Sequence, residues 1–135
     1  MKNTDIHAAT LPNGVRIVHK EEASQVAYCG FAINAGTRDE EEDESGMAHF
    51  IEHMLFKGTE KRNSWHILNR LEGVGGEINA YTTKEETFVY STVLTADFEK
   101  AVDLCSDIVF HPTFPSHEID KEVDVIIEEI NSYND

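Results

Sequence analysis

Two histidines and a glutamate fall within one turn of a predicted helix, and this segment restricts the fold more than any other. His49-Phe-Ile-Glu-His53 lies in an apolar run from Met47 to Phe56, which predicts a helix. At about 100° per residue, the His49, Glu52 and His53 side chains share one face. Imidazoles at i and i+4 can bind one Zn²⁺, and the adjacent carboxylate can reach a metal-bound water. The alternative is an amphipathic helix whose polar stripe happens to contain these residues.

A catalytic zinc needs a third protein ligand, and the last predicted helix, at residues 117–133, contains two candidates. Glu122 and Glu129 project about 20° apart and border the apolar stripe of this helix, whereas Glu128 projects toward solvent. A carboxylate beside a core is costly unless it is paired or binds a metal. Glu122 and Glu129 therefore both need a partner, unless the segment is simply an acidic surface helix.

The remaining pattern predicts an α+β fold. A turn at residues 12–14 leads into a first strand, and the nearly continuous apolar run at residues 25–35 predicts a central strand. Further strands are predicted at residues 78–82 and 87–94, and further helices at residues 64–72 and 96–109. The order strand-strand-helix-helix occurs twice along the chain, which indicates an antiparallel or mixed sheet with helices packed on one face.

The charge balance excludes some partners. Eleven Lys and Arg against 26 Asp and Glu give a net charge of −15, so we expect no nucleic acid and no membrane as partner. Residues 1–14 lack the apolar run of a signal peptide, and no later run has the length of a membrane span. These features predict a cytoplasmic protein.

Two other features are predicted to be structurally ordinary. Cys29 and Cys105 each lie in an apolar stretch, far apart in the sequence, and are expected to be buried thiols rather than a disulfide or a metal-type pair. The acidic block at residues 39–44 is expected to be a solvated loop.

The helix segment also carries a family resemblance. Gly46-Met-Ala-His-Phe-Ile-Glu-His-Met-Leu-Phe-Lys-Gly-Thr59 resembles the signature of the inverzincin zinc metallopeptidases, the pitrilysin and insulinase family that includes mitochondrial processing peptidase. Further segments resemble family segments in the same order, namely residues 10–14, 34–38, 79–82 and 125–130. The resemblance therefore covers nearly the whole chain.

By this resemblance, the chain is a zinc-dependent endopeptidase that hydrolyses peptide bonds through a zinc-bound water. It implies that His49, His53 and Glu129 bind one zinc ion per chain, that Glu52 is the general base, and that Glu122 is a supporting acidic residue of the catalytic site.

The resemblance also implies a substrate-binding strand. The segment at residues 78–82 resembles an edge to which an extended peptide adds as another strand, with contacts from Asn79, Ala80 and Tyr81. A plain edge or core strand is an equal alternative. The expected substrate is a peptide or small protein, and the negative charge favours a basic one.

Peptidases of this family are longer than 135 residues, which gives three expectations. Residues 1–135 are expected to be the N-terminal part of a zinc peptidase catalytic domain, a partial domain that is inactive or weakly active alone. Surface left by the missing C-terminal half is expected to drive self-association. The alternatives are a non-catalytic scaffold subunit, disfavoured by the intact metal and base residues, and a zinc-binding or purely structural domain.

Overall fold

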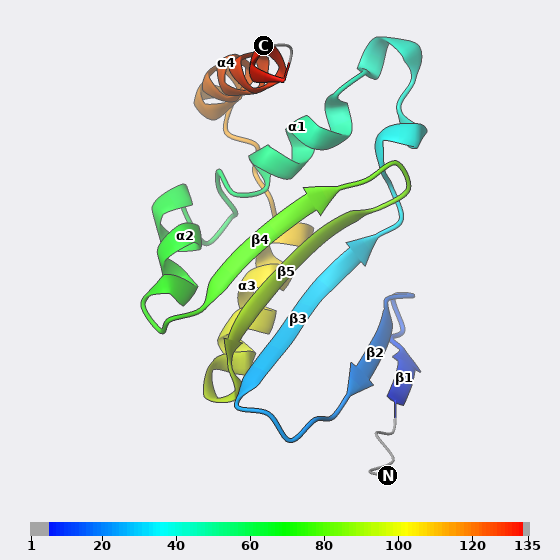
Figure 1. Ribbon diagram of the computed structural model, residues 1–135, viewed down its shortest axis with the longest axis vertical. Coiled ribbons are helices and arrows are strands. Elements are labelled where there is room, and N and C mark those ends of the chain that lie inside the picture. Colours follow the sequence, from blue (N-terminus) through cyan, green and yellow to red (C-terminus); the bar gives the residue numbers. More distant parts are fainter. Residues whose placement is uncertain (1–5, 134–135) are drawn as a thin grey trace.

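The computed structural model describes residues 6–133 and has an α+β architecture with antiparallel strand pairs (Figure 1). The strands are β1 Ile6–Thr10, β2 Arg16–Lys20, β3 Val26–Ile33, β4 Glu77–Thr82 and β5 Thr87–Leu94. The helices are α1 Met47–Met54, α2 Ser64–Glu72, α3 Phe98–Phe110 and α4 Ser116–Ser132. The predicted fold class is confirmed. The predicted bounds of α2 are those observed, and α1 ends two residues earlier than predicted.

The main sheet has three antiparallel strands in the order β3-β5-β4, with β5 in the centre. The prediction that residues 25–35 form a central strand is wrong, because within the described residues β3 pairs only with β5. Along β3, exposed residues alternate with partly buried ones, and Tyr28 is 75% exposed. An unbroken apolar run is compatible with both a central strand and an edge strand, so periodicity alone could not separate the two.

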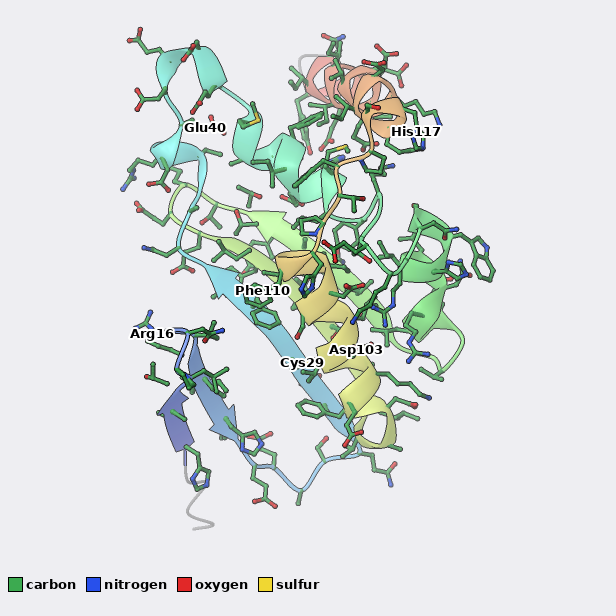
Figure 2. The ribbon with its side chains drawn as sticks, turned by 180° about the vertical axis from the view of Figure 1, so that it is seen from behind. Arg16, Cys29, Glu40, Asp103, Phe110 and His117 are labelled. Atoms are coloured by element: carbon green, nitrogen blue, oxygen red, sulfur yellow. The ribbon has the colours of Figure 1, made fainter. Side chains whose placement is uncertain are left out.

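The core lies between the sheet and the helices α2 and α3. Helix α3 packs against β3 and β5, behind the sheet in Figure 1 and in front of it in Figure 2. Alternate residues of β5 are buried in this layer. The central cluster consists of Leu55, Ile67, Leu71, Val89, Val93, Ala101, Leu104 and Ile108. Leu55 directly follows α1, so the helix with the histidines is anchored in the core at its carboxyl end.

The two first strands form a separate hairpin. β1 pairs with β2, from Ile6 opposite Lys20 to Thr10 opposite Arg16, through the turn that the sequence predicts. Strand β1 itself is not predicted from the sequence. Every residue of both strands is exposed, so the hairpin contributes little to the core.

Two predictions concern the location of the protein in the cell, namely the absence of a membrane span and of a signal peptide. Within residues 6–133, no helix combines the length and apolar character that crossing a bilayer requires. The prediction of no signal peptide concerns residues 1–14, of which residues 1–5 lie outside the described residues. The cytoplasmic location stays a prediction.

Candidate metal centre

Helix α1 begins where the acidic block folds back on it. Gly46 has a φ of +93°, a left-handed conformation that glycine adopts without a steric penalty. The Glu40 carboxylate accepts hydrogen bonds from the backbone N–H groups of Gly46 at 3.0 Å and Ala48 at 2.8 Å, and so caps the helix. The acidic block is therefore more than a solvated loop. A run of acidic residues does not reveal which carboxylate returns to a helix end.

The structure brings His49, His53 and Glu129 together from α1 and α4, which lie side by side (Figure 1). The two histidine Nε2 atoms are 3.0 Å apart. Glu129 Oε2 lies 3.9 Å from His49 Nε2 and 3.7 Å from His53 Nε2. A tetrahedral zinc with bonds of about 2.0–2.1 Å holds neighbouring ligand atoms about 3.3 Å apart. The three partly buried side chains therefore fit a zinc ion, with only small adjustments needed.

Glu122 supports this group from behind. Its Oε1 accepts a hydrogen bond from His53 Nδ1 at 2.7 Å, and Lys57 Nζ lies 2.8 Å from its Oε2. A proton held on Nδ1 leaves the Nε2 lone pair of His53 directed at His49 and Glu129, as a metal ligand requires. The sequence left Glu122 and Glu129 both open as ligands, and the geometry separates them. The role of Lys57 is not evident from the sequence alone.

Burial and partners act in opposite directions on Glu122, which is 4% exposed. Burial alone would raise the pKa of this carboxyl group, but the hydrogen bonds from Lys57 and from His53 Nδ1, together with the positive charge of Lys57, lower it below its ordinary value. The carboxylate therefore stays ionised at neutral pH, as an acceptor for His53 Nδ1.

Glu52 projects from the same helical turn toward β4. Thr82 Oγ1, at the end of β4, donates a hydrogen bond of 2.6 Å to Glu52 Oε2. This contact fixes the carboxylate beside the histidines. Sequence analysis does not assign a role to Thr82, although the residue ends the segment that resembles a substrate-binding edge. Only the packing of α1 against β4 brings the two residues together.

The three predicted substrate contacts lie on β4, which pairs only with β5 within the described residues. Asn79 and Ala80 line a pocket beside the metal centre, and Asn79 Oδ1 accepts a hydrogen bond from the Ala80 N–H at 3.1 Å. Tyr81 is not part of this pocket and stacks on Phe88, with ring centroids 5.0 Å apart. The other lining residues are Glu52, His53, Phe56, Lys57, Ser64, Leu68 and Glu122.

Comparisons with known proteins identify relatives of this chain. The sequence model described as insulinase, peptidase family M16, matches residues 16–135. The chain is 39% identical over 127 residues to a protein of Arabidopsis thaliana named as probable mitochondrial-processing peptidase subunit beta. This alignment covers 93% of the chain and 24% of the relative. An uncharacterised zinc protease of Bacillus subtilis is also 39% identical over 127 residues, which is 93% of the chain and 31% of that protein.

The fold is similar to that of a solved protease. The crystal structure of a protease from Helicobacter pylori matches with a TM-score of 0.89 and 25% sequence identity, over 93% of this chain and 31% of that one. The chain thus spans about a quarter to a third of the length of the proteins it matches.

Proposed function

The chain belongs to the insulinase family, peptidase family M16, and from this premise we propose that it forms the zinc-binding and substrate-binding part of a metalloendopeptidase. The observation that carries the proposal is the convergence of His49, His53 and Glu129 within 4.8 Å of one another, with Glu52 on the same turn of α1. The names of the relatives, a zinc protease and a processing peptidase subunit, support it.

Each residue of the site has a role in the proposed reaction. Zinc held by His49, His53 and Glu129 would supply Lewis acidity, which polarises the scissile carbonyl and makes water more acidic. Glu52 removes the proton from the attacking water and returns it to the leaving amine. The hydrogen bond from Thr82 holds one oxygen of Glu52, so the other can transfer the proton.

The free side of β4 is the proposed substrate site. An extended peptide that pairs with this strand would lie beside Glu52, because Thr82 at the end of β4 contacts that residue. The adjoining pocket offers Asn79 and Ala80 to such a peptide. The net charge of −15 favours basic peptides as substrates.

Metal analysis tests the ligand set. We expect the purified protein to contain about one zinc per chain and His53→Ala to lose most of it, because two ligands hold the ion much less tightly than three. His66→Ala is the matched control, since His66 is an exposed residue of α2 outside the cluster. Zinc-free wild type, or a His53→Ala variant with the zinc content of wild type, would contradict the proposal.

Peptide cleavage tests the base. Because residues 1–135 are expected to be inactive or weakly active alone, the assay uses a protein of the relatives' length that contains this chain. In that protein we expect Glu52→Gln to retain zinc and to lose cleavage of a quenched fluorescent basic peptide by about 10²–10⁴-fold, because an amide cannot accept the proton. Glu128→Gln, an exposed change on α4, should cleave like wild type. If Glu52→Gln leaves the activity unchanged while zinc is bound, the ion is structural and Glu52 is not the base.

A further inference from the structure

Away from the metal centre, two thiols that are far apart in the sequence meet between the sheet and α3. Cys29 lies on the edge strand β3, and its backbone position is opposite Ser91 of β5. Ser91 Oγ lies 3.2 Å from Cys29 Sγ and 3.4 Å from Sγ of Cys105, which lies on α3. Because one hydroxyl oxygen contacts both sulfur atoms, the two sulfurs are at most 6.6 Å apart, the sum of the 3.2 Å and 3.4 Å contacts. Figure 2 shows Cys29 on β3, close to α3.

The two thiols differ in access and in acidity. Cys105 is completely buried, whereas Cys29 is only partly buried. The hydrogen bond from Cys105 lowers the pKa of Cys29 to about 6 against the effect of burial, and Ser91 adds to this lowering. The same bond and burial raise the pKa of Cys105. A partly exposed thiol with a lowered pKa thus lies near a buried thiol with a raised pKa.

We propose that Cys29 and Cys105 are a reversible oxidation site, which a peroxide such as hydrogen peroxide converts into an intramolecular disulfide. Neither thiol belongs to the metal centre, so the site is separate from the proposed peptidase chemistry. The geometry carries the proposal, because the Ser91 hydroxyl contacts both sulfur atoms within the folded protein, so a small side-chain rotation can bring the two sulfurs together.

The chemistry balances in two steps. The Cys29 thiolate attacks one oxygen of hydrogen peroxide, the O–O bond breaks, and Cys29 sulfenic acid and water form after protonation of the leaving hydroxide. The Cys105 sulfur then attacks the sulfenic sulfur, the S–O bond breaks, and a second water leaves with the thiol proton. Overall, two thiols are oxidised and one peroxide is reduced. A dithiol reductant such as dithiothreitol reverses the change.

The disulfide would join the edge strand β3 to the helix that covers it. The loop closed by this bond contains β4, β5, α1 and α2, so the unfolded chain would lose much of its freedom. We therefore expect the oxidised protein to unfold at a higher temperature than the reduced protein.

Mass spectrometry of the purified chain tests the proposal. After brief exposure to dilute hydrogen peroxide, the wild type should lose two hydrogen atoms from its intact mass, remain monomeric on a non-reducing gel, and yield a peptide linking Cys29 to Cys105. Dithiothreitol should restore the original mass. Dimedone, which captures sulfenic acids, should label Cys105→Ser at Cys29 but leave Cys29→Ser unlabelled, because Cys105 is buried.

Three results would overturn the proposal. They are a dimedone adduct that persists in wild type as it does in Cys105→Ser, intermolecular disulfides in place of the internal one, and thiols that stay reduced. Circular dichroism checks that both serine variants fold. The wild-type result decides alone if one variant fails to fold, because the internal disulfide and a persistent sulfenic acid differ in mass.

Discussion

The Glu122 carboxylate bridges His53 and Lys57 at the back of the candidate metal centre. His53 Nδ1 contacts one oxygen of the carboxylate and Lys57 Nζ contacts the other, so both oxygens have a partner although the side chain is buried. Buried carboxylates of this kind act through the metal ligand they hold, since they set its tautomer and orientation. In the proposed reaction, Glu122 would therefore act as a positioning residue and Glu52 as the general base.

The first prediction concerns Glu122→Gln. The amide keeps the size of the side chain but loses the charge that stabilises a proton on His53 Nδ1, so zinc affinity should fall by about 10–100-fold. Competition with a chromophoric chelator measures this without reference to activity. Glu128→Gln removes an exposed charge from the same helix and should leave the affinity near that of wild type. Equal losses in the two variants would show that only the overall charge of α4 matters.

Asp107 of α3 is a second buried carboxylate, and it anchors the loop that follows α1. Thr59 Oγ1 donates to its Oδ2 at 2.6 Å, and Arg62 Nη1 donates to the same oxygen at 2.5 Å. Burial alone would raise the pKa of Asp107, but these two hydrogen bonds and the charge of Arg62 outweigh it and lower the pKa. Its Oδ1 has no hydrogen-bond partner within the described residues, and His111 Nδ1 lies 3.7 Å away.

The second prediction is a loss of stability in acid through Asp107. Because its folded-state pKa is below the unfolded value, the carboxylate stabilises the fold above about pH 4, and the contribution disappears as the pH falls through the folded pKa. At neutral pH, Asp107→Asn should lower the free energy of unfolding by about 2 kcal/mol.

Urea unfolding at a series of pH values measures this effect. The difference between wild type and Asp107→Asn should shrink below about pH 4. Asp120→Asn, at an exposed site on α4, controls for loss of a surface charge. A difference that stays constant down to the lowest pH would contradict the assignment.

At the scale of elements, α1 is held at both ends. Glu40 caps its first turn, and the loop that follows it is tied to α3 by Thr59 and Arg62. Leu55 lies in the core between these attachments. The two histidines therefore project from a helix with little freedom to shift, as pre-organised metal ligands require.

The hairpin β1–β2 is the least supported element. Its strands pair with each other, and all their residues are exposed, whereas alternate residues of β5 are buried. An isolated two-stranded hairpin is marginally stable in water.

The third prediction is therefore fast amide hydrogen exchange in the hairpin. The hydrogen-bonded amides of β1 and β2 should exchange at least about 100-fold faster than those of β5, because the hairpin can open without exposing the core. Hydrogen exchange followed by mass spectrometry or NMR measures both sets in one sample, and β5 serves as the internal control. Equal protection would show that the hairpin opens only when the whole chain unfolds.

At the scale of the whole molecule, the chain exposes more surface than a compact protein of its mass. Its accessible surface is 9630 Å², whereas a compact monomer of 15.2 kDa is expected to expose about 7,100 Å². Part of the excess is apolar and lies on α4, where Val123, Val125 and Ile127 are each more than 40% exposed. Exposed apolar surface of this kind favours association.

The fourth prediction is self-association of the chain through α4. The apparent mass should rise with protein concentration in sedimentation experiments, because pairing two α4 faces removes apolar surface from water. The double variant Val123→Lys and Ile127→Lys places two charges on that face and should remain monomeric. Asn131→Lys adds a charge at an exposed polar site and should associate like wild type. A wild type that stays monomeric at every concentration would contradict the prediction.

The local arrangement of the candidate site follows from the amino-acid sequence alone. His49, Glu52 and His53 share a face because helix geometry follows from spacing alone, and α2 has its predicted bounds because its ends carry clear local signals. The family could also be recognised from the sequence, because its motifs occur in a fixed order along the chain and their recognition does not require the packing.

Contacts between residues far apart in the sequence become visible only in the folded structure. Glu129 lies beside the histidine Nε2 atoms, Glu122 lies behind His53, and Thr82 binds Glu52. Strand β3 lies at the sheet edge, and Cys29 and Cys105 both contact Ser91. These outcomes depend on how helices cross and how strands order themselves. Periodicity reports which face of an element is buried, but not which element covers it.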